Sequence, residues 1–277
     1  IFFIKIFFAC FFPLKKLIKN DKPEYFIAHL ITSLPLILFR IFSFKTKLIL
    51  RISGEPNLNI FRILLWKLTS KNIHLVTCPS EETKEILIKK KIFDINKIKI
   101  LYDPIIDMKQ VSKKRLNNED FDQTGKYFLS VGRLTVQKNF GFLIESFKKI
   151  SHKYPEYRLI ILGEGEEEKK LKKLISRLKL DDKVFLKGFK ENPFFYMKNA
   201  KCFILPSIYE NPGHVIIEAA INNCPIISSN CPTGPGEFLK YGKGGYLFKT
   251  NDKNDLLEKI NNFMTETENE IYKKKLF

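Results

Sequence analysis

The sequence predicts an α/β protein made of two Rossmann-like, doubly wound domains, the first of which lacks its beginning. From about residue 122 onward, short strand-like apolar runs alternate with longer runs of helical periodicity, the pattern of a parallel sheet with crossover helices. Four further strand-like runs precede residue 105. The chain opens abruptly in an apolar stretch without methionine, so we expect residues upstream of Ile1.

Length and charge limit the classes of function. The 277 residues, 44% of them hydrophobic, suffice for one large core or two domains of ordinary size. A formal net charge of +18 favours an anionic partner: a nucleic acid, a phosphorylated ligand or an acidic membrane surface. Charge alone does not choose among these, because many of the lysines lie along amphipathic segments and can be solvated helix faces.

Cysteines and apolar runs bear on the cellular setting. The five cysteines lie in apolar surroundings without a C-x-x-C pair, which predicts neither a zinc site nor a disulfide framework and favours a reducing cytoplasm. The opening run, IFFIKIFFACFF, contains Lys5, is too short to span a bilayer and is followed by no signal-peptide cleavage site. The apolar run 25–42 is better explained as a strand followed by a helix with Pro35 near its start.

The first domain is predicted to span residues 1–110. Its strands are expected in the runs EYFIAHL, TKLILRISG, IHLVTCPS and IKILYDP, with helical stretches between them. The basic, aromatic opening segment, IFFIKIFFACFFPLKKLIK, forms either an interfacial surface against acidic lipids or core helices of this domain. Residues 111–125 are polar and without periodicity, so we expect a linker there.

The second domain is predicted over residues 126–277 and forms a complete doubly wound unit. Strands are expected at 126–134, 157–165 and 183–189 and in KCFILPS, CPIISS and GGYLF. Helices are expected at 139–155 and 166–180 and in NPFFYMKNA, NPGHVIIEAAINN and DKNDLLEKINNFM. A glycine-rich loop, NCPTGPGEFL, is expected to border the same cleft as the helix before it.

Two polar clusters follow strands of this domain, where open parallel sheets bind their ligands. In SVGRLTVQKN, Gly132 lets the backbone approach a ligand, while Arg133 and Lys138 offer two cations suited to a diphosphate. An ordinary basic surface loop would contain the same residues. In LGEGEEEKK, Gly163 and Gly165 are weaker indications, because a tight turn after a strand needs glycine with or without a ligand.

A third cluster, ENPGHVIIE, combines a helix start with two carboxylates. We expect the helix to begin at its Pro-Gly pair, so that the amides from His214 through Ile217 form an anion site. Glu210 precedes that site, and Glu218 lies about one and a half turns inside the helix. The two carboxylates are expected to bind two hydroxyl-bearing parts of one extended ligand. Alternatively, Glu210 only favours the helix dipole and Glu218 forms a salt bridge.

In order and spacing, several motifs resemble the group 1 (family 4) glycosyltransferases of bacterial surface-polysaccharide synthesis: VGRL with QKN and LIESF, LGEGEEEKKL, LKGF, LPSIYENPGHVIIEAA, and GPGEFL with GGYLF. The resemblance covers essentially all of 122–277, and residues 23–105 resemble the later part of the acceptor-binding domain. It implies the GT-B architecture, in which two Rossmann-like domains face a cleft.

The resemblance also implies the reaction. A sugar would pass from a nucleotide-diphosphate donor, a UDP-sugar in preference to a GDP-sugar, to a lipid-linked or polysaccharide acceptor with retention of anomeric configuration. No metal or further cofactor is implied, and no Asp-x-Asp motif ends a strand. The expected location is the inner face of the cytoplasmic membrane, as a peripheral protein on anionic lipids, without a nucleic-acid partner.

Site residues follow from the same resemblance. Catalysis would depend on Glu210, which contacts the donor sugar, and on Arg133 and Lys138, which hold the diphosphate. Glu218 would take the ribose hydroxyls, and Phe189 would lie against the base. The remaining residues expected around the donor nucleotide, with backbone amides at the phosphates, are Gly132, Gly163, Gly213, His214 and Val215.

Two residues depart from the family pattern. Pro212 stands where many members have an aromatic residue, and Ser53 stands where many carry a histidine that reaches the donor sugar; His29 is a candidate substitute. Ser53 and the expected missing beginning keep an alternative open: a catalytically inactive nucleotide-sugar-binding or scaffold fragment of the same fold. Nucleic-acid binding rests on charge alone, and a dehydrogenase is disfavoured because no Gly-x-Gly-x-x-Gly is present.

Overall fold

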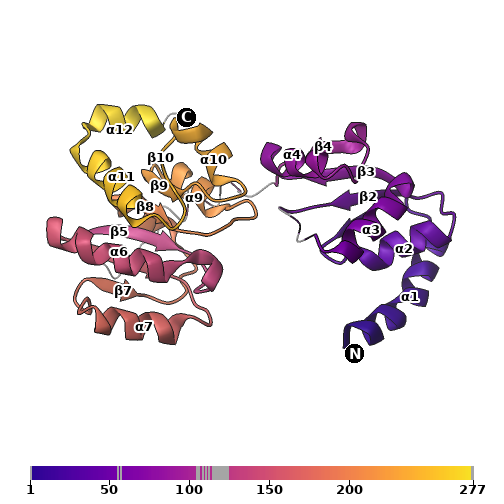
Figure 1. Cartoon of the computed structure of the whole chain (residues 1–277), viewed down its shortest axis with the longest axis horizontal. Coiled ribbons are helices and arrows are strands. Elements are labelled where there is room, and N and C mark those ends of the chain that lie inside the picture. The colour runs from indigo at the N-terminus through magenta and orange to yellow at the C-terminus, as the bar shows by residue number, and fades with distance from the viewer. Residues whose placement is uncertain are drawn as a thin grey trace. The chain divides into compact units, whose positions relative to one another are not determined.

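The computed structural model divides into two compact units, Ile1–Asp103 and Pro104–Phe277, each with its own parallel sheet (Figure 1). It describes residues 2–54, 56, 58–103, 107, 109, 111, 113 and 125–275. The division after Asp103 comes before the domain end expected at residue 110. Nearly all of the expected linker, 111–125, lies outside the described residues.

The first unit is a four-stranded sheet in the order β1-β2-β3-β4, with helices between the strands. All three strand pairs are parallel, and the four strands lie where the sequence predicts them. The elements are α1 (Phe2–Asp21), β1 (Tyr25–His29), α2 (Ser33–Ile41), β2 (Lys47–Arg51), α3 (Ile60–Thr69), β3 (Ile73–Cys78), α4 (Glu81–Lys89) and β4 (Ile98–Ile100).

Alternating burial along the strands builds the core of the first unit. In β2, Leu48 and Leu50 are fully buried, and Trp66 of α3 and Leu87 of α4 join the same cluster. Helix α1 contributes Ile18 to this core, which supports the alternative that the opening segment is a core helix. None of the described helices is long and apolar enough to cross a membrane.

The second unit is a six-stranded parallel sheet in the order β10-β9-β8-β5-β6-β7 (Figure 1). Its strands are β5 (Lys126–Val131), β6 (Tyr157–Leu162), β7 (Val184–Leu186), β8 (Cys202–Leu205), β9 (Ile226–Ser229) and β10 (Tyr246–Phe248). The order runs outward in both directions from the pair β5 and β8, so the sheet is doubly wound as predicted. This pair is the topological switch point, where such sheets bind their ligands.

Helices cover both faces of this sheet because side chains alternate along each strand. In β5, Phe128 packs into the core with α6 and α11, while Tyr127 and Leu129 pack into the core with α8 and α9. The helices are α6 (Phe140–Lys153), α7 (Glu168–Arg177), α8 (Phe194–Asn199), α9 (Val215–Ile221), α10 (Pro235–Phe238), α11 (Lys253–Thr265) and α12 (Glu268–Lys275).

Two helices of the second unit differ from the sequence prediction. The expected glycine-rich loop contains α10, which begins with Pro235 at its first position after Gly234 at a φ of 116°. Proline suits the first helical turn because that turn's N–H groups lack intrahelical acceptors, so the short helix forms despite its glycines. Helix α12 was not predicted from the sequence.

Four of the five cysteines are buried, whereas Cys10 is exposed on α1, contrary to the apolar surroundings expected for all five. Burial raises the pKa of the Cys78 and Cys231 thiols to about 11.

At neutral pH, an aromatic disulfide reagent should therefore react rapidly with one thiol per chain and with all five after unfolding. Cys10→Ser should remove the rapid phase, and rapid reaction of a second thiol in the folded protein would contradict this burial.

Candidate active site

The candidate site lies at the carboxyl ends of β5 and β8, the switch point of the second unit. Ser130 Oγ of β5 donates a hydrogen bond of 2.6 Å to the carbonyl of Ile204 in β8, which ties the two strand ends together. Two cavities of about 410 and 560 Å³ open here, and both are lined by Gly132, Arg133 and Glu218. They therefore adjoin and form one cleft within this unit.

The site residues predicted from the sequence all line one or both of these cavities. Arg133, Gly132 and Glu218 lie between the two. The smaller cavity is also lined by Lys138, Glu210, Gly213, His214 and Val215. The larger cavity is also lined by Gly163 and Phe189, whose ring is 69% exposed. Residues up to 86 positions apart in the sequence thus meet at one end of the sheet.

Close backbone packing explains the glycines at the floor of the cleft. A Cβ atom on Gly163, whose φ is 135°, would lie 1.9 Å from the carbonyl oxygen of Gly132. A Cβ atom on Gly165 would lie 2.4 Å from the carbonyl oxygen of Leu134. The Gly-x-Gly pattern is therefore required by the approach of the β6 turn to the β5 turn, whatever ligand binds.

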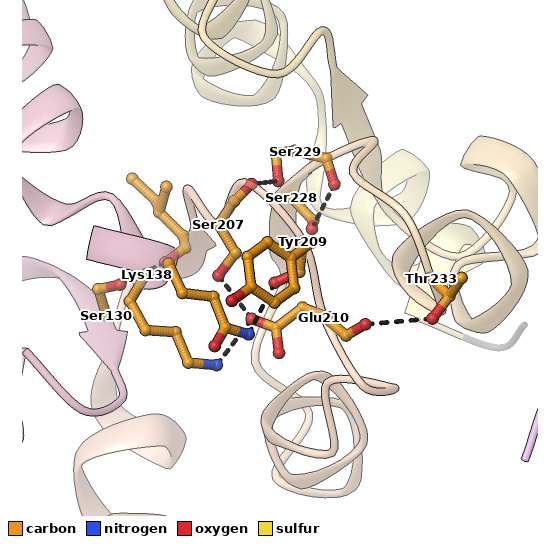
Figure 2. A network of polar contacts seen from close by, with 10 residues as sticks. Ser130, Lys138, Ser207, Tyr209, Glu210, Ser228, Ser229 and Thr233 are labelled. Carbon is orange, nitrogen blue, oxygen red and sulfur yellow. Dashed lines mark hydrogen bonds and ion pairs between the residues drawn. The ribbon is translucent and has the colours of Figure 1, made fainter. Parts of the chain in front are cut away.

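A buried ion pair joins two of the predicted catalytic residues (Figure 2). Lys138 Nζ lies 2.7 Å from Oε1 of Glu210, whose side chain is only 4% exposed. Ser207 Oγ donates a second hydrogen bond to the same carboxylate oxygen at 2.5 Å. The carboxylate is thereby fixed in one orientation at the wall of the smaller cavity. Charge neutralisation by Lys138 allows this carboxylate to be buried.

Sequence reasoning missed the residues that hold this pair in place. Ser229 Oγ donates to the carbonyl of Ser207 at 2.6 Å, and Thr233 Oγ1 donates to the carbonyl of Glu210 at 3.1 Å (Figure 2). The amide of Glu210 in turn donates to the carbonyl of Pro232 at 2.6 Å. The only available signal in the sequence was Ser207 itself, a polar residue two positions after the buried strand β8 and three positions before a carboxylate.

The loop after β5 is fastened to the loop after β8 by side-chain amides. Gln137 Nε2 donates to the carbonyl of Tyr209 at 2.9 Å, and the amide of Ile208 donates to the carbonyl of Gln137 at 2.9 Å. Asn139, in the left-handed conformation, donates from Nδ2 to the carbonyl of Pro206 at 3.2 Å. These bonds place Lys138 opposite Glu210.

The helix after Glu210 starts later than predicted. Helix α9 begins at Val215 with His214 as its N-cap, so Glu218 lies in the first turn and not one and a half turns inside. The amide of Ile216 donates to the carbonyl of Gly213 at 3.0 Å. The N–H group of Ile216 is therefore not available to a ligand, although the sequence analysis placed it in the anion site. Gly213, at a φ of 88°, continues the turn instead of the helix.

Other expected or possible sites contribute less. Within the described residues, no three His, Cys, Asp or Glu side chains are grouped closely enough to hold a metal ion. A separate cavity of about 220 Å³ near α9, α10 and α12 has a largely apolar lining that contains none of the predicted site residues. His29 is the exposed last residue of β1, and Ser53 follows β2 in the first unit.

A family model described as "Glycosyl transferases group 1" matches residues 111–275, which contain the whole of this cleft. The chain belongs to the group 1 glycosyltransferases. Among related proteins of this family, it is 33% identical to an uncharacterized glycosyltransferase of Methanocaldococcus jannaschii over 90% of this chain and 69% of that protein. The sequence resemblance to the family is thereby confirmed.

Two further comparisons concern chemistry and fold. The chain is 28% identical, over 83% of its length, to the N-acetylgalactosamine-N,N'-diacetylbacillosaminyl-diphospho-undecaprenol 4-alpha-N-acetylgalactosaminyltransferase of Campylobacter jejuni, and spans 64% of that glycosyltransferase. It also resembles the crystal structure of Anabaena Alr3699/HepE in complex with UDP, with a TM-score of 0.77 and 19% identity over 95% of this chain and 75% of that one. The fold class is GT-B, as predicted.

Proposed function

We propose that this chain transfers a sugar from a nucleotide-diphosphate donor, with retention of anomeric configuration, to a lipid-linked or glycan acceptor. The observation that carries this proposal is the gathering of the predicted donor residues around two adjoining cavities at the switch point. Family membership supports the class of reaction. The roles of individual residues and the identity of the donor are part of the proposal.

The diphosphate is placed between the two cavities. Arg133 is exposed there and lines both of them, and Lys138 lines the smaller one beside Glu210. A guanidinium fork and an ammonium group together match the charge and geometry of a diphosphate. The backbone amides from Gly213 to Val215 add N–H donors at the start of α9. The charge that develops on the leaving diphosphate is stabilised by these groups.

The two glutamates bind the polyol ends of the donor. Glu218 lines both cavities and takes the ribose hydroxyls, while Phe189 lines the larger cavity and lies against the base. Glu210 lines only the smaller cavity and binds hydroxyls of the donor sugar. The nucleoside then occupies the larger space and the sugar the smaller one.

The transfer step needs no protein nucleophile. The acceptor hydroxyl oxygen forms a bond to the anomeric carbon on the face from which the diphosphate oxygen departs, and a donor phosphate oxygen takes the hydroxyl proton. The products are the glycosylated acceptor and a nucleoside diphosphate. In this scheme Arg133 and Lys138 stabilise the departing diphosphate, and the fixed carboxylate of Glu210 orients the sugar.

A UDP-sugar is the preferred donor and the inner face of the cytoplasmic membrane the preferred location. The similar Anabaena structure is a complex with UDP, and the Campylobacter relative is named for a diphospho-undecaprenol acceptor. The alternative, an inactive nucleotide-sugar-binding or scaffold fragment, is favoured by Ser53. Calorimetric titration with UDP, GDP, ADP and their monophosphates tests the donor site directly. Binding of none of them would contradict the proposed function.

Glu218→Ala is expected to weaken binding of UDP by about 10- to 100-fold, because hydrogen bonds from ribose hydroxyls to a carboxylate are worth about 1.5–3 kcal/mol. Calorimetry with UDP measures the change. Glu145→Ala is the control, because Glu145 forms an exposed pair with Lys253 on the surface of α6. UDP affinity equal to that of the unmodified chain would remove the ribose role of Glu218.

A further inference from the structure

Helix α3 of the first unit has an apolar outer face. Ile60 and Phe61 are 82% and 84% exposed, and Leu64 and Leu68 are 55% and 58% exposed. The inner face of the same helix is also apolar and packs Trp66 into the core. A helix that is apolar all round normally lies in a protein core or against a membrane.

Other segments of this unit also expose apolar side chains, but α4, the next helix along the chain, does not. Its exposed positions, Glu81, Glu85 and Lys89, are all charged. At about 100° per residue, the exposed apolar residues of α3 and the exposed Lys67 fall within one stripe about 120° wide. The exposed Lys71 lies in the 3-10 turn Ser70–Asn72, directly after the helix. We call this set, Ile60, Phe61, Leu64, Lys67, Leu68 and Lys71, the α3 stripe.

Charge indicates what kind of surface the α3 stripe fits. Residues 56–80, which contain α3, include Arg62, Lys67 and Lys71 but no Asp or Glu. Apolar side chains at the start of a helix and lysines at its end suit the boundary of an anionic bilayer, where the lysine stems follow the apolar layer and their ammonium groups meet lipid phosphates. Pairing two copies through this stripe would instead bring lysines together without a neutralising acid.

We propose that the α3 stripe is the surface by which this protein docks onto an anionic membrane. This inference rests on the proposed function, because a lipid-linked acceptor has its reacting end at that membrane. It differs from the expectation that the opening segment, residues 1–19, forms the interfacial surface.

The test is cosedimentation of the full chain with vesicles of mixed phosphatidylglycerol and phosphatidylcholine. Phe61→Gln combined with Leu64→Gln should lower binding at least about tenfold, because full burial of one such side chain is worth about that factor. The matched control is Ile95→Gln combined with Tyr102→Gln, which removes one aliphatic and one aromatic exposed side chain of the same unit outside the stripe. This control should bind like the unmodified chain.

A second pair of variants tests the charge. Lys67→Gln combined with Lys71→Gln should lower binding to the mixed vesicles about 10- to 30-fold, because each lysine near an anionic surface contributes about 1 kcal/mol. Pure phosphatidylcholine vesicles should bind the unmodified chain weakly. Normal vesicle binding by the Phe61 and Leu64 variant would overturn the proposal. If the Phe61 and Leu64 substitutions dissociate a dimer and leave vesicle binding unchanged, the stripe is a self-association surface and the proposal is likewise overturned.

UDP titration of the same variants separates this inference from the proposed function. Substitutions in the α3 stripe should leave UDP affinity unchanged, since the cleft of the second unit contains none of these residues. Vesicle binding without UDP binding would contradict the proposed function but retain the docking surface. UDP binding without vesicle binding would support the proposed function and overturn the docking surface.

Discussion

Glu210→Gln is expected to slow sugar transfer by about 100- to 1000-fold, the loss typical of removing one preorganised electrostatic group at a reacting centre. The carboxylate is buried, accepts hydrogen bonds from Lys138 and Ser207, and lines the cavity assigned to the donor sugar. The amide oxygen of glutamine can keep these bonds, so the fold should persist while the charge is lost. Release of UDP from UDP-glucose, UDP-galactose and UDP-N-acetylglucosamine measures the rate.

Binding should respond differently from the rate. In the Glu210→Gln variant, Lys138 no longer pairs with a carboxylate, so UDP affinity should stay the same or rise as the diphosphate meets a less neutralised ammonium group. Glu145→Gln is the control, because it removes an exposed carboxylate of the same unit without touching the cleft. A transfer rate within about threefold of that of the unmodified chain would exclude the proposed role of Glu210.

Lys138→Ala is expected to weaken UDP binding by about 10- to 100-fold and uridine binding little, since charge-assisted hydrogen bonds to phosphate are worth about 1.5–3 kcal/mol. The same substitution should lower the free energy of unfolding by about 1–3 kcal/mol, because Glu210 would keep a buried charge with Ser207 as its remaining side-chain partner in the described part of the chain. Calorimetry with UDP, UMP and uridine measures the first effect, and denaturant unfolding the second.

A double variant separates these two effects. Adding Glu210→Gln to Lys138→Ala should restore most of the stability, because a neutral amide costs less to bury than an unpaired carboxylate. It should not restore UDP affinity, because the cation remains absent. Lys253→Ala is the control for stability, since its pair with Glu145 is exposed and worth at most about 1 kcal/mol. Equal loss of UDP and uridine affinity in Lys138→Ala would contradict a diphosphate role.

Local patterns were sufficient to predict the strands, most of the helices and the sheet class. Apolar runs such as 157–162 have the length of a strand and end at a glycine, so β6 was predictable from the sequence without tertiary information. Helical periodicity likewise identified α6 and α7. The start of α9 was wrong by about two residues because Gly213 adopts a positive φ, which glycine tolerates, and extends the turn.

The amino-acid sequence by itself determined the two parallel sheets, the predicted residues that line the cleft, and the family resemblance that the comparisons confirmed. Only the tertiary structure decided that Lys138 and Glu210 form one buried pair and that Ser207, Ser229 and Thr233 hold it. The physical reason is distance along the chain: a hydrogen bond between residues 72 positions apart leaves no periodic signal and exists only once β5 and β8 lie side by side.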